Sequence, residues 1–227
     1  MSIKDNLDEI HRIIDVAAKK SGRTKEDITL CAVTKTVDKD RILEAIELGI
    51  NNIGENKVQE LRDKLEYIPK DVNIHLIGQL QTNKVKYIIN HVSLIHSLDR
   101  LSLLKELDKE AKKNDRLVNA LIQINLTDDS NRGGVQIGDL PEFVKMVKNY
   151  KNVRVKGLMC VAHNTDDVNV IRDDFKKMKL EFDRLMLYNI DNVSADILSM
   201  GMSSDYEIAI EEGATMVRIG TKIFGKR

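Results

Sequence analysis

Lys35 is the first residue of the sequence whose position could support chemistry. It follows an apolar run at Thr29–Val33, in the stretch AVTK. A lysine at the end of a buried strand can reach the mouth of a barrel, where its amine can form a Schiff base with an aldehyde. In a lysine-rich chain, a single lysine at a strand end is usually a solvated surface charge. A reactive role for Lys35 is therefore a hypothesis that other residues of the sequence must support.

Two later segments place glycines and hydroxyl residues at the ends of predicted strands. One contains Ser199, Gly201 and Ser203, and the other contains Gly220 and Thr221. Barrel enzymes commonly hold phosphate at the loops after their last two strands, where backbone N–H groups and a helix start face the anion. Each segment alone is compatible with an ordinary turn, but their occurrence after two consecutive strands favours a phosphate site.

Three further residues lie on or next to predicted strands. Asn56 follows the second strand and offers both donors and acceptors to a ring substituent. The alternation around Arg218 leaves open whether its guanidinium points into the barrel or pairs with a barrel carboxylate. His75 precedes an apolar run, and we expect it to pack or to hydrogen-bond to a neighbouring strand rather than to catalyse.

The chain alternates between apolar, β-branched runs and stretches with helical periodicity. The predicted strands are Thr29–Val33, Asn52–Gly54, Ile74–Gly78, Leu94–His96, Val118–Leu126, Val153–Val161, Ile197–Met202 and Met216–Gly220. Helical connections between strands indicate parallel pairing, because parallel pairs need long crossovers. An open, doubly wound sheet and a closed barrel both fit. Eight strands in 227 residues favour an α/β fold with a single (β/α)8 TIM-type barrel over residues 1–227, preceded by an N-terminal helix.

The helices between the strands have recognisable starts and ends. Apolar residues recur every three or four positions after Ile3, and we expect that first helix to end at Gly22. Further helices are predicted over Asp38–Leu48, over Asp99–Lys113 with Asp99 as its cap, and over Asp166–Leu187 with Val170 on its apolar face. Ser204 and Glu207 have the spacing of a capping box that opens another helix.

Composition and charge narrow the range of functions. Lys and Arg total 36, as do Asp and Glu, so no net charge would recruit nucleic acid or an anionic membrane. No apolar run is long enough for a membrane span, and the charged first residues do not resemble a signal peptide, which predicts a cytoplasmic protein. Cys31 and Cys160 lie in apolar runs and are expected to be buried thiols. Without paired histidine ligands, no metal site is predicted.

Motifs along almost the whole chain resemble the pyridoxal phosphate homeostasis protein family, relatives of the N-terminal barrel of alanine racemase. They are AVTK, IGENKVQE, HLIGQLQTNK, IHSLDR, LIQINL, KGLM and LSMGMSSDYEIAIEEGATMVRIGTKIFG. Each motif is weak alone, but all of them in the right order are highly specific. The resemblance implies a fold type III barrel that binds pyridoxal 5′-phosphate (PLP).

The resemblance also implies a role for each candidate residue. Lys35 would hold PLP as a Schiff base, Arg218 would face the pyridine nitrogen, and Asn56 would lie near the ring. A permanently charged guanidinium would keep that nitrogen unprotonated and weaken the ring as an electron sink. The residues expected to hold the phosphate are Ser199, Gly201, Gly220 and Thr221, with Ser203 as a helper.

The family is thought to hold PLP and to deliver it to apo-enzymes, usually as a monomer and without established turnover. The sequence therefore carries no assigned catalytic residue. It departs from the family pattern at Gln79, where histidine is common, and at Asn131–Gly134, where a lysine usually precedes the glycine. Arginine in that loop cannot take part in aldehyde transfer. Neither departure touches the predicted pocket.

Two enzymatic functions and a pure interaction module are the alternatives. A PLP-dependent racemase needs a second base, which alanine racemase takes from a tyrosine of a further β-domain that we do not expect here. Of the tyrosines, Tyr206 is the one near the pocket loops. A cofactor-free enzyme acting on a phosphorylated substrate would need acid–base carboxylates at the strand ends. Only a few carboxylates lie there, namely Glu55, Asp128 and Asp129. The interaction module ranks last because the pocket residues form a coherent set.

Overall fold

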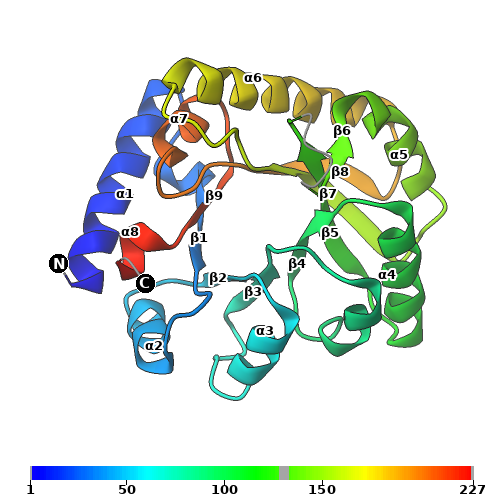
Figure 1. The fold of residues 1–227 in the computed structure, drawn as a ribbon, viewed down its shortest axis with the longest axis horizontal. Helices are drawn as coiled ribbons and strands as arrows, with labels where there is room; N and C mark the ends of the chain where they lie inside the picture. The colour runs from blue at the N-terminus through cyan, green and yellow to red at the C-terminus, as the bar shows by residue number, and fades with distance from the viewer. Residues whose placement is uncertain (1, 128–132, 226–227) are drawn as a thin grey trace.

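The computed structural model describes residues 2–127 and 133–225, so Asp128, Asp129 and the Asn131–Arg132 pair lie outside the described residues. The strands form one sheet in the order β4–β3–β2–β1–β9–β8–β7–β5–β6, and a further pairing of β4 with β5 closes it into a ring (Figure 1). The two-residue β6 lies beside β5, outside the ring. Eight parallel strands therefore form the predicted closed barrel, and the open sheet is wrong.

Most predicted strands agree closely with the observed ones. The ring consists of β1 (Thr29–Val33), β2 (Asn52–Glu55), β3 (Asn73–Leu76), β4 (Leu94–Leu98), β5 (Val118–Asn125), β7 (Val153–Cys160), β8 (Val193–Ser199) and β9 (Met216–Ile219), with β6 at Val135–Gln136. The largest difference is in β8, which starts and ends earlier than predicted. Its first five residues, VSADI, are partly buried except for the exposed Asp196, so they carry no apolar run to mark the strand.

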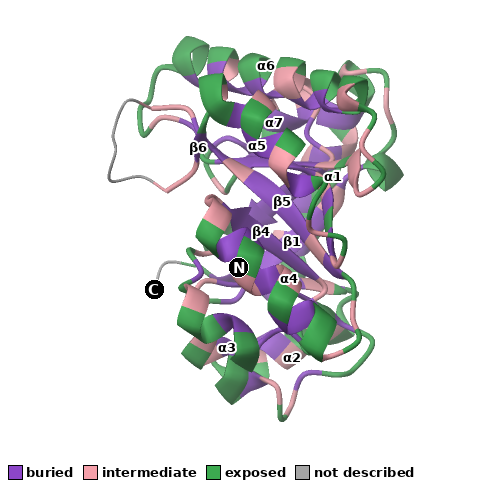
Figure 2. Ribbon diagram, turned by 90° about the vertical axis from the view of Figure 1, so that its right-hand side faces the viewer, coloured by how far each residue is buried: buried purple, intermediate pink, exposed green. Residues whose placement is uncertain are grey.

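The helices cover the outside of the ring. They are α1 (Ile3–Lys20), α2 (Lys39–Glu47), α3 (Val58–Lys64), α4 (Leu101–Lys113), α5 (Leu140–Val147), α6 (Val168–Leu185), α7 (Tyr206–Glu211) and α8 (Thr221–Phe224), with 3-10 turns at Lys25–Asp27, Thr82–Tyr87, Ile137–Asp139 and Met186–Tyr188. Figure 2 shows buried strands inside and helices with exposed outer faces. A capping box between Ser2 and Asp5 starts α1, which ends before Gly22 as predicted.

Three details of the predicted helices are wrong. The cap of α4 is Arg100, and Asp99 binds the Arg100 guanidinium at 2.5 Å instead of capping the helix. Asp205 precedes α7 without any side-chain cap, so Ser204 and Glu207 do not form a capping box. Val170 is 39% exposed. The neighbouring Ile171 takes the buried position on α6, because adjacent helical residues point in directions about 100° apart.

Side chains inside the barrel come from alternate residues of the strands. An apolar cluster of Cys31, Leu94, Leu121, Met159 and Met216 fills part of this space, separately from the core beneath the helices. Polar contacts also cross it, because β4 and β8 are not neighbours in the ring and yet His96 and Ser199 are hydrogen-bonded. The barrel interior is therefore partly polar.

The described residues include no helix that could cross a membrane and no cluster of metal-ligating side chains. The two cysteines are free and buried, as predicted. Burial raises the pKa of the Cys31 and Cys160 thiols to about 12, so both stay protonated at neutral pH.

Gly157 lies where the pairing of β7 with β8 shifts register, and we predict that it accepts no side chain. Its φ is +144°, and an added Cβ would lie 2.0 Å from the Ile197 carbonyl oxygen. We expect Gly157→Ala to lower the free energy of unfolding by about 1–3 kcal/mol through backbone strain. Gly138→Ala, where the added Cβ meets no atom within 4 Å, is the control. Urea unfolding measures both variants, and equal effects would contradict the prediction.

Candidate functional site

A cleft of about 520 Å³ opens at the pole of the barrel where the strands end. It is lined by Val33, Lys35, Met202, Ser203, Ser204, Arg218, Gly220, Thr221 and Lys222. A hollow of about 570 Å³ also lies between α1 and the starts of β1 and β2, but Lys25 at its edge is paired with Glu26, which lines the same hollow. The cleft is the candidate site because it gathers a lysine, an arginine, hydroxyls and backbone N–H groups.

Lys35 lies in the turn that follows β1, and its side chain is exposed to the cleft. Among the described residues its amine makes no hydrogen bond or ion pair. The turn itself is fixed, because Thr36 adopts a φ of 58° and its N–H donates to the Glu60 carboxylate. A free amine on a fixed turn suits attack on a carbonyl carbon.

A buried ion cluster holds the backbone next to Lys35. Lys64 donates to the Thr34 carbonyl at 2.7 Å, to Glu55 at 2.7 Å and to Glu60 at 2.8 Å. The Thr34 hydroxyl also donates to Glu55, at 2.5 Å. Burial raises the pKa of Glu55, although hydrogen bonds from Lys64 and Thr34 act in the opposite direction. The cluster therefore anchors both residues that flank Lys35.

Ser203, Gly220 and Thr221 form one corner of the cleft. The Ser203 hydroxyl oxygen accepts long hydrogen bonds from the N–H groups of Gly220 at 3.3 Å and Lys222 at 3.4 Å. Thr221 is exposed at the start of α8. This corner offers backbone N–H groups and hydroxyls, which are the donors that bind phosphate oxygens.

Gly201 shapes the loop that lines this corner. Its φ is +91°, and an added Cβ would lie 2.5 Å from the Ala209 Cβ on α7. The Gly201 carbonyl also accepts the Arg218 N–H at 3.0 Å. Gly201 is buried and does not line the cleft, so only glycine allows the loop to pack this closely on α7.

Arg218 points into the barrel and is only 4% exposed. Its guanidinium donates to the Ser199 hydroxyl at 2.6 Å and to the Cys160 carbonyl at 2.7 Å. Burial lowers its pKa. No described carboxylate forms an ion pair with it, so the predicted alternative of a barrel carboxylate is wrong for the described residues. The floor of the cleft is thus a buried cation held by two neutral groups.

Ser199 and Asn56 do not line the cleft. Ser199 is fully buried, and its hydroxyl contacts Arg218 and His96. Asn56 is half-buried beyond the end of β2, and a Cβ at Gly78 would lie 2.3 Å from its carbonyl oxygen. Of the predicted residues, the structure therefore gathers Lys35, Ser203, Arg218, Gly220 and Thr221 around one space.

The sequence prediction missed several residues of the site. Lys222 lines the cleft, with its ammonium 4.8 Å from the centre of the Tyr206 ring. His96 contacts the residue that holds Arg218. The signal for His96 was its place at an inward position of a predicted strand, where a polar residue needs a partner.

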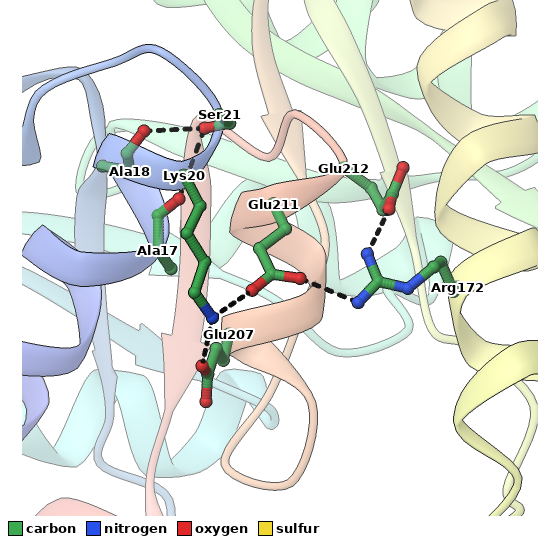
Figure 3. Close-up of polar contacts among 8 residues, drawn as sticks. All are labelled: Ala17, Ala18, Lys20, Ser21, Arg172, Glu207, Glu211 and Glu212. Atoms are coloured by element: carbon green, nitrogen blue, oxygen red, sulfur yellow. Dashed lines mark hydrogen bonds and ion pairs between the residues drawn. The ribbon is translucent and has the colours of Figure 1, made fainter.

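An ion-pair network fixes α7, the helix that follows the cleft-lining loop (Figure 3). Lys20 of α1 contacts Glu207 at 3.2 Å and Glu211 at 2.7 Å. Arg172 of α6 contacts Glu211 at 2.7 Å and also pairs with Glu212. Lys20 is half-exposed, so such pairs add little stability, and their main effect is to join α7 to both neighbours.

The fold and the cleft define a class of protein: a parallel (β/α)8 barrel with a lysine and an anion-favouring corner at one pole. The sequence matches the family described as "Alanine racemase, N-terminal domain" over residues 6–227. The pyridoxal phosphate homeostasis protein of Aquifex aeolicus is 40% identical over 229 residues, covering 100% of this chain and 99% of that protein. The chain therefore belongs to the alanine racemase N-terminal domain family and, within it, to the pyridoxal phosphate homeostasis proteins.

Solved structures agree with this assignment. PipY of Synechococcus elongatus with PLP bound matches with a TM-score of 0.85 at 30% identity, covering 99% of this chain and 100% of that one. Alanine racemase of Corynebacterium glutamicum matches with a TM-score of 0.69 at 14% identity, covering 97% of this chain and 62% of that one. The second likeness concerns the fold alone.

We predict that Lys64→Met destabilises the protein strongly. The side chains of Lys64 and Glu55 are 7% and 0% exposed, and removal of one buried partner leaves the other charge uncompensated. We expect a loss of about 3–5 kcal/mol in the free energy of unfolding at neutral pH. Lys109→Met is the matched control, because Lys109 is 67% exposed in its pair with Glu106. That control should change stability by no more than about 0.5 kcal/mol.

The defect of Lys64→Met should depend on pH. Loss of the lysine raises the pKa of Glu55 in the folded protein further above its unfolded value. A carboxyl with a raised folded-state pKa favours the folded state when protonated, so the defect should shrink as pH falls through that pKa and grow as pH rises. A defect that stays constant from acid to neutral pH would contradict this account of Glu55.

Proposed function

We propose that this chain binds PLP in the cleft through Lys35 and takes part in intracellular PLP homeostasis. The observation that carries the proposal is Arg218, a buried cation without a described carboxylate partner, in a cleft that also exposes the amine of Lys35. A buried charge without a direct ion-pair partner is costly, and an anionic ligand in the cleft offsets part of that cost. PipY, which shares the fold, has been solved with PLP bound.

The residues present fit a phosphorylated aldehyde. The long hydrogen bonds of Ser203 leave the N–H groups of Gly220 and Lys222 able to turn to phosphate oxygens, with the Thr221 hydroxyl beside them. We propose that Ser199 and Gly201 contribute indirectly, Ser199 by holding Arg218 and Gly201 by shaping the loop. The place of Arg218 at the pyridine nitrogen and of Asn56 near the ring stay predictions.

The chemistry that PLP supplies is a reactive aldehyde, which forms a Schiff base with a lysine amine. Lys35 is suited to this bond because its amine is free and its turn is anchored by the Lys64 cluster. At its predicted place beside the pyridine nitrogen, Arg218 would keep a positive charge toward the ring and therefore disfavour protonation of that nitrogen. A ring held in this way is a poor electron sink, which suits storage better than turnover.

A carrier is favoured over a racemase. The curated relative of Aquifex aeolicus is named for homeostasis and not for a reaction. None of the described residues that line the cleft is a tyrosine, and Tyr206 is 1% exposed, so it offers no second base at the cleft. We propose delivery of PLP to apo-enzymes by a monomeric, single-domain protein of the cytoplasm. Each of these four points stays a prediction.

We predict that Lys35 is the residue that PLP modifies. After incubation with PLP and reduction by borohydride, mass spectrometry should find the added mass on the peptide that contains Lys35. Lys35→Ala should lose the label, whereas Lys39→Ala, at an exposed lysine just beyond the same turn, should keep it. A label on Lys222, which lines the same cleft, would contradict the assignment of Lys35.

We predict that PLP passes from this protein to an apo-enzyme during contact. PLP-loaded protein is mixed with an apo aminotransferase while a phosphatase destroys free PLP, and recovery of aminotransferase activity is followed. Direct delivery predicts recovery faster than the rate at which the phosphatase alone drains the loaded protein. Recovery limited to that rate would show release into solution and reject delivery.

A further inference from the structure

A polar hollow of about 460 Å³ lies at the opposite pole of the barrel from the cleft, where the strands start. Thr29, Asn52 and Asn73 line it and are the first residues of β1, β2 and β3. Its wall includes the amide of Asn119 and an ion pair of 3.0 Å between Lys156 and Asp196. The proposed PLP site uses none of these residues.

His75 lines this hollow from inside the barrel. It is only 4% exposed, and its Nδ1 contacts the His96 Nε2 at 3.0 Å. Its other ring nitrogen, Nε2, has no hydrogen-bond partner among the described residues. This nearly buried imidazole therefore presents one ring nitrogen to a polar hollow, where it can hydrogen-bond to a bound group.

The hydrogen bonds continue from His96 to the cleft at the other pole. The His96 Nδ1 contacts the Ser199 hydroxyl at 3.1 Å, and Arg218 donates to that hydroxyl at 2.6 Å. Arg218 lines the cleft, and His75 lines the hollow. Four hydrogen-bonded side chains therefore form a continuous series through the barrel interior, from one pole to the other.

Counting protons shows which group donates and which accepts in each hydrogen bond of this series. Burial lowers the pKa of His75 to about 4 and that of His96 well below its ordinary value, so each ring is neutral and carries one proton. Ser199 already accepts from Arg218, and the His96 Nδ1 is the described acceptor for its own proton. The reverse direction would leave that buried hydroxyl proton unbonded, at a cost of about 1–3 kcal/mol.

The proton positions at the hollow are then fixed. If Nδ1 of His96 accepts, its Nε2 carries the proton and donates to Nδ1 of His75. The Nε2 of His75 consequently carries the proton and presents an N–H donor to the hollow. The amides of Asn52 and Asn119 each donate one proton, to the Asn51 side chain and to the Ser93 carbonyl, and Lys156 donates to Asp196. Each of these groups carries at least one further proton for an acceptor in the hollow. The hollow therefore suits an acceptor-rich ligand.

We propose that this hollow is a second binding site, for a small carboxylate. The series of hydrogen bonds from His75 to Arg218 couples it to the cleft. One carboxylate oxygen accepts the His75 N–H, and Lys156, which also pairs with Asp196, donates a further N–H at the rim. Hydrogen bonds in series polarise one another, so an anion at His75 draws the Ser199 hydroxyl and Arg218 toward the hollow. Anions at the two poles then compete for Arg218, and each weakens the binding of the other.

The first test observes the ring nitrogens of the histidines by NMR in the full chain. Before ligand is added, the nitrogen shifts of His75 and His96 should show the proton on Nε2 in both rings. Titration with acetate and then succinate through the millimolar range should shift the His75 signals in a saturable way. Protons on Nδ1, or no saturable shift at His75, would overturn the proposal.

Two variants separate the hollow from the cleft. Lys156→Met should weaken succinate binding several-fold, whereas Lys151→Met, at an exposed lysine that does not line the hollow, should leave it unchanged. His75→Phe keeps a ring of similar size and should abolish binding. Because Lys156 lies at the rim, its variant should still fold if His75→Phe does not. Succinate binding that both variants retain would place the carboxylate elsewhere and reject the site.

The coupling is tested with PLP. Saturating succinate should raise the PLP dissociation constant several-fold in the unchanged protein, and Ser199→Ala should abolish this effect while succinate still shifts the His75 signals. An unchanged dissociation constant would reject the coupling. The binding of succinate is measured without PLP, so a protein that failed to bind PLP would contradict the proposed function and leave the test of the hollow intact.

Discussion

The charge of Arg218 inside the barrel is the interaction on which the site depends. Its guanidinium is held by a hydroxyl and a backbone carbonyl, both neutral, and the buried Asp205 carboxylate acts on it without forming an ion pair. The protein therefore keeps a positive charge beneath the cleft that is not ion-paired within the described residues, and such a charge favours an anion in the cleft. The same charge orients the hydroxyl of Ser199 and, through it, two neutral histidines. Hydrogen bonds thus connect this buried cation, which lines the cleft, to His75 at the opposite pole.

Lys35 combines an exposed amine with an anchored backbone. The amine is exposed and free among the described residues, while the backbone on both sides of it is tied to Glu55, Glu60 and Lys64. Three charged groups, Lys64, Glu55 and Glu60, are buried or half-buried in this ion cluster, and their desolvation opposes folding. Their effect is to fix the turn at Lys35. The position of Lys35 is thus set by a network that does not line the cleft, which leaves the amine itself available for a carbonyl carbon.

Much of the fold and part of the site were predictable because they depend on local patterns. Strand β1 coincides with its apolar run, and Gly22 follows α1 as expected. The first half of β8 and the caps of α4 and α7 were not predictable. They depend on partial burial and on the angle at which a chain enters a helix, and neither leaves a pattern in neighbouring residues.

The sequence by itself determined the barrel, the strand-end position of Lys35 and the glycine and hydroxyl residues after the last strands, because hydrophobic period and residue type are local properties. The tertiary structure alone decided which of those residues share a space. Ser199 and Ser203 are four positions apart, yet one is buried under Arg218 and the other lines the cleft. The direction of a side chain and its partners from distant strands arise only when the ring closes. For the same reason, the link from Arg218 to His75 could not be read from the sequence.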